Sequence, residues 1–160
     1  LRLLQRQEQL MTETGKTENL GMNLGKQGLT LSNMDRFEEA MQMHVRSGEV
    51  FEEQGNMIGV SISYANQGLI YREWGKHEEA LKMHEKEEEL CRKAKFADGL
   101  IRSLGYQALA LYELKQYKEA LKFFRQQEKT AGKNKADIGE LFTEGRTKTE
   151  QELNKGKLEI

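Results

Sequence analysis

The sequence predicts an all-α protein in which pairs of antiparallel helices stack side by side as a solenoid. Three observations lead to this fold class. A pattern of small, apolar and aromatic residues returns every 40 positions, as at Ala40, Ala80 and Ala120. Within one period, residues such as Tyr64 and Tyr71 recur at the spacing of one helix face. The 160 residues include no proline and 32% are charged, which favours helices with large solvent-exposed faces.

The 40-residue period holds without a gap over three consecutive units. The segment 37–41 returns at 77–81 and again at 117–121, each time with glutamate and alanine in the same places. The apolar positions keep the same phase: Leu24, Tyr64 and Leu104; Leu31, Tyr71 and Leu111; Met34, Trp74 and Leu114; Met43, Met83 and Phe123. Each unit is therefore expected to form the same structure, a first helix A and a second helix B joined by a short turn.

The periodic pattern assigns nearly the whole chain to one domain, a solenoid over residues 1–154. We expect a half repeat at 1–14, full repeats at 15–54, 55–94 and 95–134, a capping helix at 136–154 and a frayed tail at 155–160. Helix A is expected at roughly 17–33, 57–73 and 98–113, and helix B at roughly 36–54, 76–94 and 116–131. Asp35 (with Glu38 as its capping-box partner), Asn56 and Asp98 are the predicted N-caps.

The middle unit resembles the tetratricopeptide repeat in its small and aromatic positions. Tyr64, Gly68, Tyr71, Gly75 and Ala80 match that family's pattern, and His84 stands in an aromatic position that Phe124 occupies in the third unit. The resemblance implies a right-handed helical-repeat solenoid. The 40-residue period is similar to the long-repeat branch found in kinesin light chains and spindle-orientation scaffolds. Ser47, Glu87 and Gln127 replace the family's second alanine on helix B, so we expect loose or solvent-facing packing there.

Several polar residues are expected to have structural roles. Gln27, Gln67 and Gln107 replace a family leucine and should be buried in a hydrogen-bonded ladder. His44 and His84 are too few for a closed zinc site, so we interpret them as packed side chains and predict no metal site. The acidic run 85–89 should be a solvated outer face with helical ion pairs, from Glu88 to Arg92 and from Glu89 to Lys93. Cys91 falls in a core position and is not expected to be reactive.

Composition and motifs exclude several classes of protein. The formal net charge of −1 argues against nucleic-acid binding, which needs a basic surface. A membrane-spanning run is missing from the sequence, and the single cysteine fits a cytoplasmic, reducing environment. We find no phosphate-binding loop, no metalloprotease motif and no nucleophile motif, so no enzyme activity, catalytic residue or cofactor is predicted. The chain begins at Leu1 rather than methionine, which favours a piece of a longer protein.

The resemblance implies that the A helices form the concave face of the stack, where a ligand would bind. Leu29, Leu69 and Leu109 are expected to form an apolar row, with small residues beside it that allow close approach of a ligand backbone. The other candidates supply amide, cationic or aromatic groups. The complete predicted groove comprises Gly25, Lys26, Leu29, Ala65, Asn66, Leu69, Arg72, Gly105, Tyr106, Leu109 and Tyr112.

The sequence therefore predicts a non-catalytic scaffold that binds a protein or peptide segment in this groove. One alternative is a peptide-responsive sensor domain of a larger protein, in which the same groove takes a small signal. A more distant alternative is an RNA-binding helical repeat, which the near-neutral charge disfavours. The sequence makes no prediction of the partner's identity or of an oligomeric state.

Overall fold

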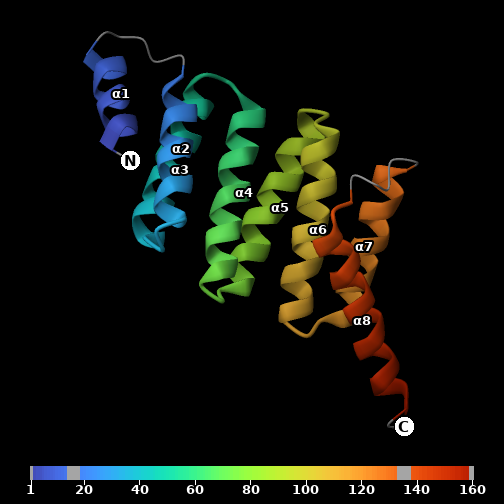
Figure 1. Ribbon diagram of the computed structural model, residues 1–160. Coiled ribbons are helices and arrows are strands. Elements are labelled where there is room, and N and C mark those ends of the chain that lie inside the picture. The colour runs from blue at the N-terminus through green and yellow to red at the C-terminus, as the bar shows by residue number, and fades with distance from the viewer. Residues whose placement is uncertain (1, 14–18, 133–137, 159–160) are drawn as a thin grey trace.

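The computed structural model describes residues 2–13, 19–132 and 138–158. Within these ranges the chain forms helices and no strand, and Figure 1 shows the helices side by side from one terminus to the other. The helices are α1 (Arg2–Glu13), α2 (Leu20–Ser32), α3 (Phe37–Glu53), α4 (Met57–Glu73), α5 (His77–Lys93), α6 (Ala97–Glu113), α7 (Tyr117–Ala131) and α8 (Glu140–Leu158). The prediction of an all-α helical repeat is confirmed.

Neighbouring helices pack in sequence order. α2 packs on α3, α4 on α5 and α6 on α7, and the second helix of each pair also packs on the first helix of the next. First helices touch one another as well, α2 with α4 and α4 with α6. α1 packs on α2 at one end, and α8 packs on both α7 and α6 at the other. Each contact is thus between near neighbours in the sequence, as expected of a repeat protein.

The turns after α2 to α6 share one backbone geometry. Each contains a residue with positive φ, between 54° and 70°, at Asp35, Gly55, Gly75, Lys95 and Lys115. In the first of these turns the Arg36 amide donates to the Leu31 carbonyl at 3.0 Å, which is the long hydrogen bond of a Schellman motif. A Cβ added at Gly55 or Gly75 would meet nothing within 4 Å. The absence of a steric obstacle explains why non-glycine residues also occupy this position.

Of the three predicted N-caps, one is confirmed and two are wrong. The Asn56 side chain accepts from the Gly59 amide at 2.9 Å and caps α4. Asp35 takes the left-handed turn position instead, and Arg36 is the N-cap residue of α3. Asp98 lies inside the first turn of α6, whose N-cap is Phe96. The Asp98 carboxylate there still has a favourable interaction with the helix dipole.

The core is formed where helix B approaches helix A of its own unit. Ala40, Ala80 and Ala120 are each at most 1% exposed, as predicted. His44 packs under Gly28, where an added Cβ would lie 2.6 Å from the ring Nε2, and His84 packs under Gly68 in the same way at 2.5 Å. The imidazole rings therefore require glycine on the facing helix, and the interpretation of both histidines as packed side chains is confirmed.

The expectation of loose, solvent-facing packing at the second-alanine position is wrong. Ser47, Glu87 and Gln127 are each at most 2% exposed. The Ser47 hydroxyl donates to the Gly21 carbonyl at 2.7 Å, and the Gln127 amide donates to the equivalent Ile101 carbonyl at 3.1 Å. The polar groups thus tie helix B to helix A of the same unit. A carboxylate cannot donate such a bond, so Glu87 has different partners.

The three glutamines of helix A are buried, as expected, but do not form a uniform ladder. The Gln27 amide donates to Asn23 Oδ1 on its own helix at 2.9 Å. The Gln107 amide reaches back to α5, donating to Glu88 Oε2 at 2.6 Å and to the His84 carbonyl at 3.4 Å. Gln67 lines a hollow of about 290 Å³ between α3 and α4. Similar sequence positions are therefore stabilised by different polar partners.

The last helix differs from the prediction at both ends. α8 begins at Glu140 rather than near 136, and it continues to Leu158 through most of the expected frayed tail. Residues 136, 137, 159 and 160 of these two predicted segments lie outside the described residues. Gly145 and Thr149 of α8 are buried against the stack. In the described part of the chain, none of the helices has the length and hydropathy needed to span a membrane.

Candidate functional site

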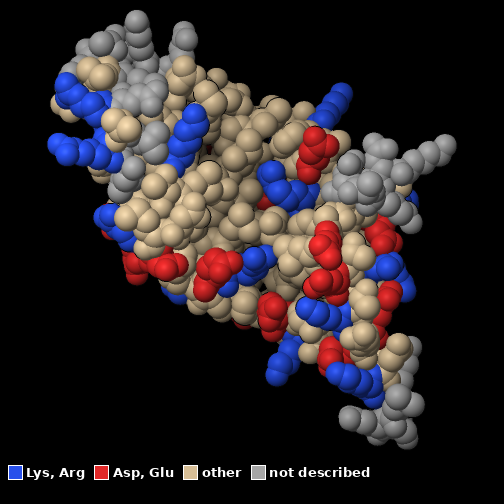
Figure 2. Space-filling view, in the orientation of Figure 1, with Lys and Arg blue, Asp and Glu red and all other residues tan. Residues whose placement is uncertain are grey.

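The candidate site is a hollow on the side of the molecule that the A helices α2, α4 and α6 form. We call it the central hollow; its volume is about 490 Å³. Figure 2 shows that uncharged side chains dominate the middle of the surface in view, whereas acidic and basic side chains lie among one another along its lower edge and toward the C-terminal end. The lining residues are Leu29, Ser32, Asn33, Asp35, Phe37, His44, Asn66, Leu69, Ile70, Arg72, Glu73 and Tyr106.

Five of the predicted groove residues meet in the central hollow. Leu29 comes from α2, Asn66, Leu69 and Arg72 from α4, and Tyr106 from α6. They therefore belong to three successive units. The Leu29 side chain is 49% exposed, so the hollow has an accessible apolar wall.

The third leucine of the predicted row lies elsewhere. Leu109 is only 9% exposed and is covered by α8, where a Cβ added at Gly145 would lie 2.6 Å from Leu109 Cδ2. Tyr112 packs against Tyr117 near the turn between α6 and α7, with ring centroids 5.5 Å apart. Neither residue lines the central hollow. The apolar row is thus open at α2 and α4 and closed at α6.

None of the predicted small residues Gly25, Ala65 and Gly105 lines the central hollow. Ala65 and Gly105 are buried. A Cβ added at Gly105 would lie 2.3 Å from the Gln127 amide nitrogen, and one at Gly25 would lie 3.6 Å from Ser47 Oγ. These positions therefore allow the helices of one unit to pack closely. Lys26, by contrast, is exposed on the surface of α2.

Tyr106 is held by side chains from three other helices. Its ring stacks on His84 of α5, with centroids 4.9 Å apart and planes 15° apart. The Arg72 guanidinium lies 5.5 Å from the ring centroid, and Phe142 of α8 meets the ring edge-on at 5.0 Å. Tyr106 also lines a second hollow, of about 570 Å³, with Asp98, Ile101, Arg102, Gly139 and Phe142. Tyr106 therefore forms a rigid partition between the two hollows.

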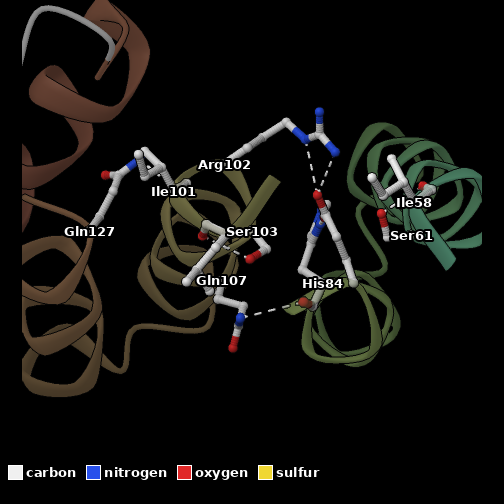
Figure 3. Close-up of polar contacts among 10 residues, drawn as sticks. Ile58, Ser61, His84, Ile101, Arg102, Ser103, Gln107 and Gln127 are labelled. Atoms are coloured by element: carbon white, nitrogen blue, oxygen red, sulfur yellow. Dashed lines mark hydrogen bonds and ion pairs between the residues drawn. The ribbon is translucent and has the colours of Figure 1, made fainter. Parts of the chain in front are cut away.

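A polar triad of His84, Glu87 and Arg102, which sequence reasoning missed, supports this partition. The His84 Nδ1 atom lies 2.8 Å from Glu87 Oε2, and Arg102 donates to Glu87 Oε1 from Nε at 3.0 Å and from Nη2 at 2.8 Å. Figure 3 shows the Arg102 guanidinium directed from α6 toward the α5 carboxylate. Glu87 and His84 are essentially fully buried. The signal was present in the repeat register, because Glu87 aligns with Ser47 and Gln127 in a core position.

The expected solvated acidic face is therefore only partly present. The predicted ion pairs from Glu88 to Arg92 and from Glu89 to Lys93 form, at 2.7 Å and 2.6 Å. The Glu88 side chain is nevertheless only 18% exposed, since it also accepts from Gln107. Glu87, in the same run, is buried. The helix thus places Glu87 in the core and Glu88 at its border, while Glu85, Lys86 and Glu89 are exposed.

His44 borders the central hollow and is buried without a carboxylate partner of the kind that His84 has. Burial lowers the pKa of His44 to about 4, which keeps the ring neutral at physiological pH. Its Nδ1 lies 3.5 Å from the Asn66 amide nitrogen, and its backbone carbonyl accepts from Ser63. Among the described residues there is no group of three His, Cys, Asp or Glu side chains that could hold a metal ion. The Asn66 amide, which lines the central hollow, lies at the outer limit of hydrogen-bond distance from His44.

Cys91 lies in the core, as the repeat register predicts. It is 1% exposed. Burial raises the pKa of the Cys91 thiol, despite a hydrogen bond with Ser61 that lowers it. The thiol is therefore neither accessible nor ionised, so it contributes nothing to the surface of the site.

Comparisons with known proteins agree with this architecture. Residues 59–127 match the tetratricopeptide repeat family. The chain is similar to the Sgt2 TPR domain from Aspergillus fumigatus, with 14% identity and a TM-score of 0.68 over 86% of this chain and 81% of that chain. It is also similar to the apo form of RapI, with 17% identity and a TM-score of 0.74. That likeness covers 97% of this chain and 61% of RapI, so the chain spans less than two thirds of RapI.

A comparison with curated protein sequences finds no match. The identities to the solved structures are low, so the likeness establishes the fold alone. The family match thus covers residues 59–127. The chain as a whole forms an all-α helical-repeat scaffold similar to that of tetratricopeptide-repeat proteins.

Proposed function

We propose that the chain is a non-catalytic module that binds a peptide or protein segment in the central hollow. The observation that carries the proposal is the convergence of Leu29, Asn66, Leu69, Arg72 and Tyr106, from three helices, on one accessible hollow of about 490 Å³. The 40-residue period further favours the long-repeat branch similar to kinesin light chains.

The lining combines the groups that peptide recognition needs. Leu29 and Leu69 offer apolar contact, and Asn66 offers an amide that can pair with a ligand's backbone. The Arg72 guanidinium lies near the Glu73 carboxylate, at 3.2 Å, while its side chain remains 27% exposed. A ligand carboxylate can therefore reach it. Because Asn66 and Tyr106 are already fixed by His44, His84 and Phe142, little side-chain entropy is lost on binding.

The experiment is a peptide-display selection on the immobilised chain, followed by affinity measurement on the selected peptides. Leu29→Glu should weaken binding at least tenfold, since it places a charge on the apolar wall. Val45→Glu is the matched control, because Val45 is 40% exposed and lines the separate hollow between α3 and α4. Circular dichroism should show both variants folded.

Two results would contradict the proposal. Selected peptides that bind Leu29→Glu normally and lose affinity to Val45→Glu would place binding on the B-helix side. A ligand whose affinity falls steeply with salt would instead indicate a polyanion such as RNA, because Arg72 is the one Lys or Arg among the residues that line the central hollow.

A further inference from the structure

The A-helix side carries an apolar strip that extends beyond the central hollow. Met22 and Leu29 of α2 are 51% and 49% exposed, and Ile58 and Ile62 of α4 are 41% and 40% exposed. On α2, Met22 and Leu29 are seven positions apart. On α4, Leu69 follows Ile58 and Ile62 at spacings of eleven and seven positions, so the residues of each helix share one face. We call these five residues the open strip. Large aliphatic side chains so exposed together are typical of a binding surface.

The open strip ends at α6. Asp98 and Arg102 take the positions that Ile58 and Ile62 hold one unit earlier, and Arg102 is paired with buried Glu87. The strip is thus two helices wide. Along α4 it extends over twelve residues, from Ile58 to Leu69, and the eleven steps between them are about 16 Å at 1.5 Å per residue. Its long axis follows the helices, so a segment crossing all three units would leave the apolar surface at the third.

The molecule itself shows what covers this face where it is closed. α8 lies on α6, with Phe142 against Tyr106 and Gly145 against Leu109. Thr149, one turn further, is fully buried and its hydroxyl donates to the Gly145 carbonyl of the same helix at 2.7 Å. A helix with a large apolar residue, then a small one, then a self-satisfied hydroxyl therefore fits the row adjoining the open strip.

We propose that the occupant of the open strip is an amphipathic α-helix of a partner protein. This inference rests on the proposed function and specifies the conformation of the bound segment. A helix of about eleven residues matches the length of the strip and presents apolar side chains at i, i+4, i+7 and i+11 to the two rows below. An extended segment would span the same length in about five residues and turn half of its side chains away.

Charge complementarity adds one feature to the partner helix. Lys26 is exposed on α2 between Met22 and Leu29, within the otherwise apolar rows. Its position on α4 is taken by Asn66, which is uncharged and bonded to His44. The partner helix therefore carries an acidic residue on the edge that faces α2, and this residue sets its register.

The test compares two peptide libraries on the immobilised chain. One is an alanine-rich helical scaffold randomised at i, i+4, i+7 and i+11, and the other is a set of extended, proline-flanked peptides randomised at alternate positions. We expect binders from the helical library, with affinities at least tenfold weaker for Leu29→Glu and Ile62→Glu and unchanged for Val45→Glu. A proline at the centre of a selected peptide should weaken binding about 100-fold, since proline disrupts a helix interior.

A charge exchange tests the register and does not depend on folding of the apolar variants. Lys26→Glu should weaken a selected helical peptide, and replacing the peptide's acidic residue by lysine should restore the affinity. Binders from the extended library alone, sensitive to Leu29→Glu, would overturn the helical occupant and leave the proposed function standing. Failure of both libraries at this face would overturn both, and an unaffected Lys26→Glu would overturn the acidic residue.

Discussion

The A-helix face is exposed to solvent over one part of this molecule and covered over another. Over α2 and α4 it is open, with Met22, Leu29 and Ile62 exposed, whereas over α6 it is covered by α8 and Leu109 is buried. The positions are equivalent in the repeat, so the leucine itself does not decide the outcome. The covering helix α8 decides whether the leucine is buried. The difference teaches that one apolar row in a solenoid serves as core at the end of the stack and as binding surface in its middle.

The covered side also differs from the open side in having an ion pair between two helices. Arg102 links α6 to Glu87 of α5, at the position where the open side has Ile62 of α4. The pair places a partly exposed guanidinium on this part of the face and joins α6 to α5. A buried ion pair adds little net stability compared with apolar packing, but losing one partner is costly. Substitution of Glu87 is therefore the first test of this difference between the two sides.

Glu87→Ala should have the largest effect. It leaves the His84 Nδ1 atom buried without its acceptor and removes both Arg102 hydrogen bonds, so the free energy of unfolding should fall by about 2–4 kcal/mol, less than for a wholly buried pair because the Arg102 side chain is 35% exposed. Urea denaturation measures the loss. Ser47→Ala, at the equivalent position of the first unit, is the control and should cost only about 1–3 kcal/mol. Equal losses in the two variants would show that the triad adds nothing beyond an ordinary buried hydrogen bond.

The pH dependence of stability should come in part from the open side. Burial lowers the pKa of His44 to about 4 in the folded chain, against about 6.5 when unfolded, so the unfolded state binds more protons between these values. The contribution of His44 to the free energy of unfolding is fully present above pH 6.5 and is lost as the pH drops toward 4. This loss is at most about 3 kcal/mol.

His44→Phe isolates this contribution, since Phe124 occupies the same position in the third unit. Chemical denaturation of both proteins between pH 4 and pH 7 should show a flatter profile for the variant. If the two profiles run parallel, the neutral state of His44 is not what links stability to pH.

Phe142→Ala tests the cover directly. Phe142 is half-buried and meets Tyr106 edge-on, so its loss should cost about 2 kcal/mol, roughly half of the value for a fully buried phenylalanine. Leu29→Ala on the open side should change the free energy of unfolding by less than about 0.5 kcal/mol, because Leu29 is exposed. Thermal and urea unfolding of the two variants compare the sides. A larger loss for Leu29→Ala would mean that the open strip is part of the core.

The repeat period predicts the fold well, because one period repeated three times fixes helix type, phase and core alanines together. It could not predict the cover over Leu109, because α8 differs from the other A helices in sequence and begins several residues later than its register implies. The cap at Asp35 failed because the turn places its left-handed residue there, and the cap at Asp98 failed because α6 already begins at Ala97, with Phe96 as its N-cap. The burial of Glu87 was not predicted because Glu87 belongs to the acidic run 85–89, which was expected to face solvent as a whole.

The last predicted difference is between two glutamines of the A helices, Gln67 and Gln107. Gln67→Leu should be neutral or slightly stabilising, within about 1 kcal/mol, since Gln67 lines the hollow between α3 and α4 and leucine is the family's residue at this position. Gln107→Leu should be destabilising by about 1–3 kcal/mol, because it removes the donor that pairs with partly buried Glu88 and the His84 carbonyl. Neither change touches the open strip, so affinity for a selected peptide should stay within twofold of the original. Urea denaturation and peptide titration of both variants separate stability from binding. A loss of binding in Gln67→Leu would place the ligand between α3 and α4 instead of on the A-helix side.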